Sequence, residues 1–217
     1  MNRTFAILAL RLAATACVLQ PASARAEEAE TQFWTSMAGG FLLDPQTPVS
    51  VALTTRFREA SSGKDQTLLR ASTQRVLTRN VSTGLLLSYN RTSGSYEARP
   101  WQQFAVRWHG VVLRTQMEER LIEGADRAEL RIRPRIQYGT RVARLYVVSS
   151  AEWTYRIQSH QRGDDSDPAY WRVSTSVSKP LWNGFEGAAG YMVMYRPRHG
   201  EPDRISHIPQ ITISRRF

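Results

Sequence analysis

Arginine and glutamate recur at every second position in the middle of the chain. The clearest case is residues 127–138, where Glu129, Arg131, Arg133 and Arg135 alternate with apolar residues. Arginine stays protonated and presents a planar fork of N–H groups, which can grip a carboxylate or another anion through two hydrogen bonds at once. The chemistry that this pattern offers is ion pairing and anion binding.

The charged residues of one parity are expected to face a common interior. Only Lys64 and Lys179 are lysines among the 29 basic residues, and arginine suits a narrow, half-dehydrated interior. The expected lumenal polar network consists of Glu97, Arg99, Arg107, Arg114, Glu118, Arg120, Glu129, Arg131, Arg133, Arg135, Arg144, Glu152 and Arg172. The same parity also includes Arg56, Arg58, Arg70, Arg156 and Glu186.

Two interpretations of such an interior stay open. The arginines can line an anion-preferring pore. Alternatively, arginine–glutamate ladders can plug a small barrel and hold it rigid, and Glu118 with Arg120 and Arg133 is the ladder to test first. A barrel of intermediate size lies between filled eight-stranded barrels and open sixteen-stranded porins.

Nucleophilic catalysis is the rival chemistry. A serine nucleophile needs a base within about 3 Å, and some membrane barrels hydrolyse lipids with such a Ser–His pair. His207 falls on the expected lipid-facing parity, but the adjacent Ser206 points to the opposite face. We therefore expect no enzyme, with a surface lipid or acyl hydrolase that uses His207 and a distant serine as the alternative.

The spacing of the charges predicts strands rather than helices. On a helix the arginines of 127–138 would scatter around the axis, and Pro134 would remove a backbone hydrogen bond. On a strand they form one polar face opposite one apolar face. A short helix within 117–130, which is rich in helix formers, is the local alternative.

The same alternation predicts eleven strands. They cover about 32–43, 48–59, 67–78, 81–92, 97–109, 111–122, 127–138, 141–156, 169–179, 184–196 and 205–217. Bacterial single-chain barrels have even strand numbers, so we expect ten or twelve. Either the predicted strand at 32–43, which contains Gly39 and Gly40, does not span the barrel, or one strand is missing from this set.

The connections between these strands alternate in length. Short links are expected at 79–80, 109–110, 139–140 and 181–183, and longer polar ones at 60–66, 93–96, 123–126, 157–168 and 197–204. Short turns on one side and long loops on the other are typical of outer-membrane barrels, with the short turns in the periplasm.

Periodicity alone does not distinguish a membrane barrel from a soluble barrel or sandwich, which also alternates but with the apolar face inward. Strands of 11–16 residues favour the membrane barrel because a tilted spanning strand needs about 9–11. Aromatic residues near strand ends suggest interfacial girdles. They are Trp34, Trp101, Trp108, Trp153, Tyr155, Trp171, Trp182 and Tyr195.

The N-terminus predicts export. Residues 1–26 have a positive start, an interrupted apolar segment and an A-x-A-like site that ends at Ala26, which together indicate a cleaved secretory signal. Residues 27–31 are expected to form a short solvated acidic leader before a single barrel domain at 32–217. The only cysteine, Cys17, lies inside the signal, so no disulfide can form within the chain.

Composition excludes several other classes. No apolar run reaches the roughly 18 residues that a spanning helix needs. The net charge of +10 is compatible with nucleic-acid binding, but arginines distributed over strands and a secretory signal argue against it. No cofactor or metal site is expected.

The motifs at 97–135 resemble a known family. Glu97-x-Arg99-x-Trp101, Arg114-x-x-x-Glu118-x-Arg120 and Arg131-x-Arg133-x-Arg135 are similar to the Domain of Unknown Function 2490 family, as are Glu152, Glu186 before Gly190-Tyr191-Met192, and Phe217. The match runs over about 33–217. It departs at Tyr170-Trp171-Arg172, where an asparagine is often found. The resemblance implies a Gram-negative outer-membrane barrel and no particular activity.

The sequence as a whole thus predicts an all-β, antiparallel outer-membrane barrel. The expected function is passive, either a narrow or plugged channel or a structural envelope barrel. The expected partners are outer-membrane lipid and lipopolysaccharide, the barrel-insertion machinery through the C-terminal Phe217 strand, and small anionic solutes.

Overall fold

Strands are the only regular elements among the residues that the structure describes. A computed structural model describes residues 27–59, 63–162, 167–198 and 200–217, and the expected signal at 1–26 lies outside them. Within the described residues no helix has the length and apolar character to cross a membrane. The alternative of a short helix within 117–130 is wrong, because strands end at Ile122 and begin again at Glu129.

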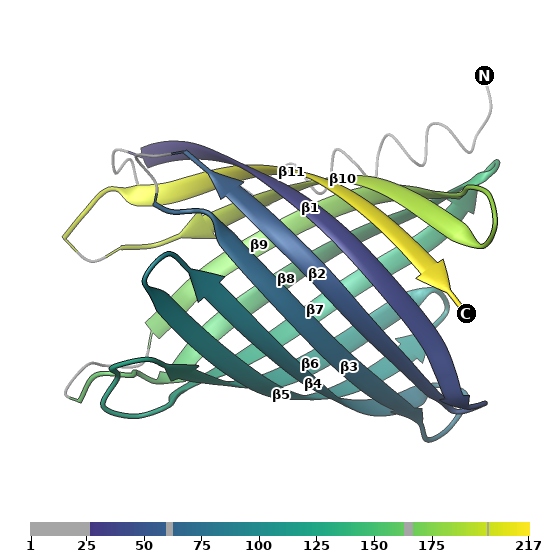
Figure 1. Cartoon of the computed structure of the whole chain (residues 1–217), viewed down its shortest axis with the longest axis horizontal. Helices are drawn as coiled ribbons and strands as arrows, with labels where there is room; N and C mark the ends of the chain where they lie inside the picture. Colours follow the sequence, from purple (N-terminus) through teal and green to yellow (C-terminus); the bar gives the residue numbers. More distant parts are fainter. Residues whose placement is uncertain (1–26, 60–62, 163–166, 199) are drawn as a thin grey trace.

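Eleven strands close into one barrel, in which each strand pairs with its neighbours in the sequence (Figure 1). Their bounds are β1 Glu27–Asp44, β2 Thr47–Arg58, β3 Gln66–Val76, β4 Val81–Thr92, β5 Ser95–Trp108, β6 Val111–Ile122, β7 Glu129–Val142, β8 Leu145–Gln158, β9 Asp167–Pro180, β10 Phe185–Arg196 and β11 Asp203–Arg216. All eleven predicted strands are confirmed.

The strand number is odd, which corrects the expected ten or twelve. In a barrel of antiparallel neighbours, an odd number leaves the first and last strands running in the same direction. β1 and β11 accordingly pair in parallel, from Glu27 opposite Asp203 to Gly40 opposite Arg216. Gly39 and Gly40 do not interrupt β1, since both pair with β2 and with β11.

Acidic residues of β1 reinforce this parallel seam. Glu28 accepts hydrogen bonds from Arg198 at 2.5 Å and from Arg204 at 3.2 Å. Glu30 is 3% exposed, accepts a hydrogen bond from Ser206, and pairs with Arg58 at 3.5 Å. The expected solvated leader at 27–31 is therefore wrong: this segment is the first part of β1, and Glu28 and Glu30 bind arginines of the neighbouring elements.

The two ends of the barrel differ in their connections. One end, here called the turn end, carries the links after β1, β3, β5, β7 and β9, each of two to four residues; the other is the loop end (Figure 1, right and left). At the loop end the β4–β5 link is only Ser93–Gly94, shorter than expected.

The β7–β8 turn is Ala143–Arg144 rather than 139–140. Gly139 lies inside β7, and a Cβ there would be 2.1 Å from the hydroxyl of Tyr146. The glycine therefore marks a close approach of an aromatic ring, and the real turn places Ala143 at a φ of 54°.

The barrel is polar inside and apolar outside. On β6, Glu118 is 1% exposed, whereas its neighbour Met117 is 52% exposed. On β4, Leu85 and Leu87 point outward and are more than half exposed. Two of the aromatic residues expected at the interface, Trp34 and Trp101, instead share the inward parity of Arg56 and Glu118, with which they pair. A small apolar cluster of Tyr170, Met192, Met194 and Ile208 also faces inward.

The seam generates a first prediction. Glu30→Ala leaves Arg58, Arg204 and Ser206 without their shared acceptor, and breaking a buried ion pair costs about 3 kcal/mol. We expect a lower urea midpoint for unfolding of the detergent-solubilised barrel. Glu201→Ala is the control, because this side chain is 65% exposed in its pair with Arg198 and surface pairs contribute under about 1 kcal/mol. Equal midpoints for the two variants would contradict a role of Glu30 in barrel closure.

Candidate functional site in the barrel interior

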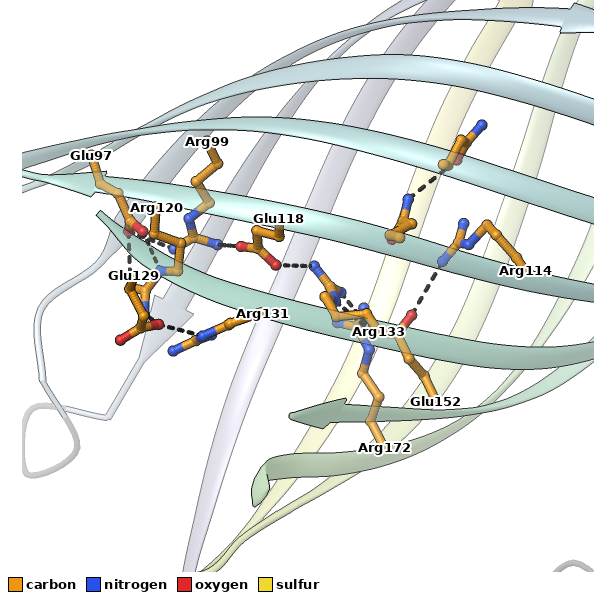
Figure 2. Close-up of polar contacts among 12 residues, drawn as sticks. Glu97, Arg99, Arg114, Glu118, Arg120, Glu129, Arg131, Arg133, Glu152 and Arg172 are labelled. Atoms are coloured by element: carbon orange, nitrogen blue, oxygen red, sulfur yellow. Dashed lines mark hydrogen bonds and ion pairs between the residues drawn. The ribbon is translucent and has the colours of Figure 1, made fainter. Parts of the chain in front are cut away.

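The centre of the interior is the guanidinium of Arg133 on β7. Its Nη1 donates to Glu118 Oε2 at 2.8 Å, and its Nε and Nη2 donate to Glu152 Oε1 at 3.0 and 2.6 Å (Figure 2). The Cζ atom of Arg133 lies 4.5 Å from the centroid of the Trp101 ring. Arg133 is 3% exposed, so these partners replace its water. A buried charge is tolerated only when it is paired in this way.

Glu152 on β8 is shared among three arginines. Besides Arg133, it accepts hydrogen bonds from Arg114 at 3.2 Å and from Arg172 at 2.5 Å. The three arginines come from β6, β7 and β9, so one carboxylate ties together the strands on both sides of β8.

A second branch lies toward the loop end. Glu97 binds Arg99 at 2.6 Å and also accepts both Nε and Nη2 of Arg120. Arg120 reaches Glu129 at 2.7 Å, and Glu129 in turn pairs with Arg131. Glu129 also contacts His160 Nδ1 at 3.2 Å.

The two branches meet at Glu118, whose Oε1 lies 3.7 Å from Arg99 Nη1 (Figure 2). The result is one continuous network along β5 to β9. Gln103 and Gln116, which join by a 3.2 Å hydrogen bond, extend its polar contacts between β5 and β6.

Strand register explains why these residues meet, but not which pairs form. Glu118 lies opposite Arg131 and Gln116 opposite Arg133, yet Glu118 binds Arg133. Diagonal neighbours on tilted strands lie within reach of long side chains, so the ladder shifts by one inward position.

Ten of the thirteen expected network residues belong to this network, and three do not. Arg135 lines the interior but has no carboxylate within ion-pair distance among the described residues. Arg107 has the inward parity but is exposed, because it lies one residue from the turn end of β5. Arg144 is an exposed turn residue, since the turn falls at 143–144 rather than at 139–140.

Several interior residues lie outside that expected set. Arg196 on β10 lines the same interior, and the Tyr170 ring lies 5.9 Å from Arg131 and 5.8 Å from Arg172. Glu28 and Glu30 had a usable signal, because they share the parity of Gln32 and Trp34. Their position next to the expected secretory segment obscured that pattern.

His207 has no serine close to it on the outer face of the strands around it. Its Nδ1 lies 2.7 Å from the hydroxyl of Tyr191, on the outer surface. Ser206 faces inward and donates to Glu30. Among the described residues of β1, β9, β10 and β11, the outward positions include threonines but no serine.

The interior encloses a cavity of about 690 Å³, lined by twelve arginines and two glutamates. Across the described part of the chain, no three histidine, aspartate or glutamate side chains are grouped so that they could hold a metal ion. The chemistry of this site is therefore that of guanidinium groups, which donate hydrogen bonds to anions.

Fold and site together define a closed β-barrel with an ion-paired, arginine-rich interior and an apolar exterior. The chain belongs to the family described as protein of unknown function (DUF2490), which matches residues 31–205. The resemblance predicted from the motifs at 97–135 is thus confirmed. No curated protein matches the chain.

Adjacent glutamates on β6 provide a matched test of the network. Glu118→Ala leaves Arg133 with one carboxylate fewer in a buried site, and we expect it to destabilise the barrel by about 3 kcal/mol. Glu119→Ala removes the same side chain from the outward face, where we expect a change below about 1 kcal/mol. Urea unfolding followed by tryptophan fluorescence measures both. Equal losses would show that burial in the network does not stabilise the barrel.

Proposed function

We propose that this protein is an exported outer-membrane β-barrel that acts as a narrow, anion-preferring passive channel. The observation that carries the proposal is the inverted polarity of the closed barrel. Apolar side chains such as Leu53, Leu69, Leu113 and Ile136 cover its outside, each more than two fifths exposed. In water this apolar surface would be in contact with solvent, whereas the hydrocarbon core of a bilayer would bury it.

Outward-facing aromatic residues near both ends of the barrel support the membrane placement. At the loop end, Phe33 and Phe57 stack with centroids 6.3 Å apart, and Trp171 stacks with Tyr195 at 5.2 Å. At the turn end, Trp108 and Trp182 are 69% and 68% exposed. Two such rows flanking an aliphatic band are the usual arrangement at the two membrane–water interfaces.

The interior supports an anion preference. Its charged lining residues are mostly arginine, and its two carboxylates are already bound by arginines. A mobile anion therefore meets guanidinium groups, while a cation meets few free acceptors. The same network narrows the lumen along β5 to β9, which favours small solutes over large ones.

The C-terminal strand supports insertion into an outer membrane. Outward-facing Ile211 and Ile213 precede Phe217, whose backbone N–H donates to the carbonyl of Gly40 at 2.8 Å. We propose that this strand is the segment recognised by the barrel-insertion machinery. We further propose that lipid and lipopolysaccharide surround the outer face.

Orientation can be tested by single cysteines, because the sole native cysteine is Cys17 in the expected signal. Asp126→Cys lies in a loop-end link and Arg144→Cys in a turn-end link, and both positions are exposed. We expect a membrane-impermeant maleimide to label Asp126→Cys on intact cells. Labelling of Arg144→Cys should require permeabilised envelopes. Labelling of neither site on intact cells, with both reactive in purified protein, would contradict the outer-membrane placement.

Channel activity is tested by planar-bilayer conductance of the folded protein, with the reversal potential measured under a salt gradient. We expect discrete steps and a reversal potential of the sign that marks anion preference. Glu118→Gln should increase that preference because it removes a lumenal negative charge, and Glu119→Gln should not. A folded barrel that never conducts would contradict the channel and support a purely structural envelope role.

A further inference from the structure

The ion pairs of the interior are unevenly distributed. The network on β5 to β9 contains four glutamates, and the seam contains Glu28 and Glu30. Among the described residues, four arginines of the cavity wall have no carboxylate within ion-pair distance: Arg56, Arg70, Arg135 and Arg196. Two of them, Arg56 on β2 and Arg70 on β3, lie on neighbouring strands.

Aromatic rings hold these two guanidinium groups without neutralising them. Arg56 lies 4.0 Å from the centroid of Trp34 and donates to Gln66 at 3.4 Å. The Cζ atom of Arg70 lies 5.6 Å from the centroid of the Trp101 ring. A cation on an aromatic face keeps its charge and can still donate hydrogen bonds. The Nε atoms of both arginines are buried and have no hydrogen-bond partner within the described structure.

Further positive charge faces the pair from other strands. Arg99 on β5 and Arg172 on β9 line the same cavity as Arg56 and Arg70, so charges of one sign share this space. Arg99 and Arg172 form ion pairs with Glu97 and Glu152, whereas Arg56 and Arg70 form none among the described residues. Charges of one sign in a partly dehydrated space destabilise one another unless a counter-charge enters.

We propose that the cavity is a binding site for a small, multivalent phosphate-class anion, held by Arg56 and Arg70 and completed by Arg99 and Arg172. The inference deepens the proposed channel function, because it assigns a ligand class and a binding step to the same lumen. It makes the protein a channel with an internal solute site rather than a simple water-filled pore.

The ligand class follows from the chemistry of the donors. Guanidinium forks match the oxygen geometry of phosphate and bind it through paired hydrogen bonds, which chloride cannot accept in the same way. A multivalent anion also counters several of the clustered charges at once. The volume of about 690 Å³ falls within the range of small-molecule sites. Because the lining side chains face the inside of a closed barrel, a soluble solute fits the site better than a lipid headgroup.

Isothermal titration calorimetry of the purified protein in detergent tests the site, with pyrophosphate as the probe at fixed ionic strength set by chloride. We expect saturable binding that weakens by about tenfold or more in the double variant Arg56→Gln/Arg70→Gln. The matched control is Arg79→Gln/Arg91→Gln, which removes the same charge from exposed positions outside the lumen and should change affinity by less than about twofold. Arg56→Lys/Arg70→Lys keeps the charge but loses the fork, so its affinity should lie between the two.

Folding and conduction are read separately from binding. The heat-dependent gel mobility of each variant reports whether its barrel is intact, and only intact barrels are compared. Absence of saturable binding in the wild type, or equal weakening in the lumenal and control double variants, would overturn the site even if the barrel conducts anions. Binding by a barrel that never conducts would overturn the channel and leave the site standing.

Discussion

The structure depends on the pairing of one buried guanidinium, that of Arg133, with Glu118 and Glu152. A charge removed from water is costly unless opposite charges and hydrogen bonds replace the lost hydration. These partners come from β6 and β8, on either side of β7, so the three strands must keep their register for the charge to be satisfied. The shared acceptor Glu152 extends this requirement to β9 through Arg172, and Arg99 extends it to β5.

The closure of the barrel, where β1 meets β11, also depends on ion pairs. Eleven strands force β1 and β11 to run in parallel, and parallel pairs are slightly less stable per residue than antiparallel ones. The seam compensates with side chains, because Glu28 and Glu30 bind Arg198, Arg204, Arg58 and Ser206. Glu28 and Glu30 therefore contribute to closure rather than to a solvated leader.

The interior has two electrostatic regions. Along β5 to β9 the arginines are bound to glutamates, so ion pairs connect the strands on this side of the lumen. Near β2 and β3 the cations are supported by Trp34 and Trp101, whose rings do not cancel their charge. Placing these two tryptophans in the lumen, rather than at an interface, is what keeps positive charge available to a solute. An anion-preferring channel with an internal site is consistent with this division.

The sequence by itself determined the strands and their two faces, because side-chain alternation in a strand is a local property of the backbone. It therefore predicted all eleven strands and ten of the network residues. It did not determine how the barrel closes, because the parallel pairing of β1 with β11 is a contact between the two ends of the sheet. The pairing of Glu118 with Arg133, rather than with the opposite Arg131, depends on strand tilt and side-chain reach across the sheet. Gly139 lies inside β7, where the close approach of the Tyr146 side chain leaves no room for a Cβ. Only the tertiary structure decided these features, since each arises from contacts between strands rather than from the pattern within one.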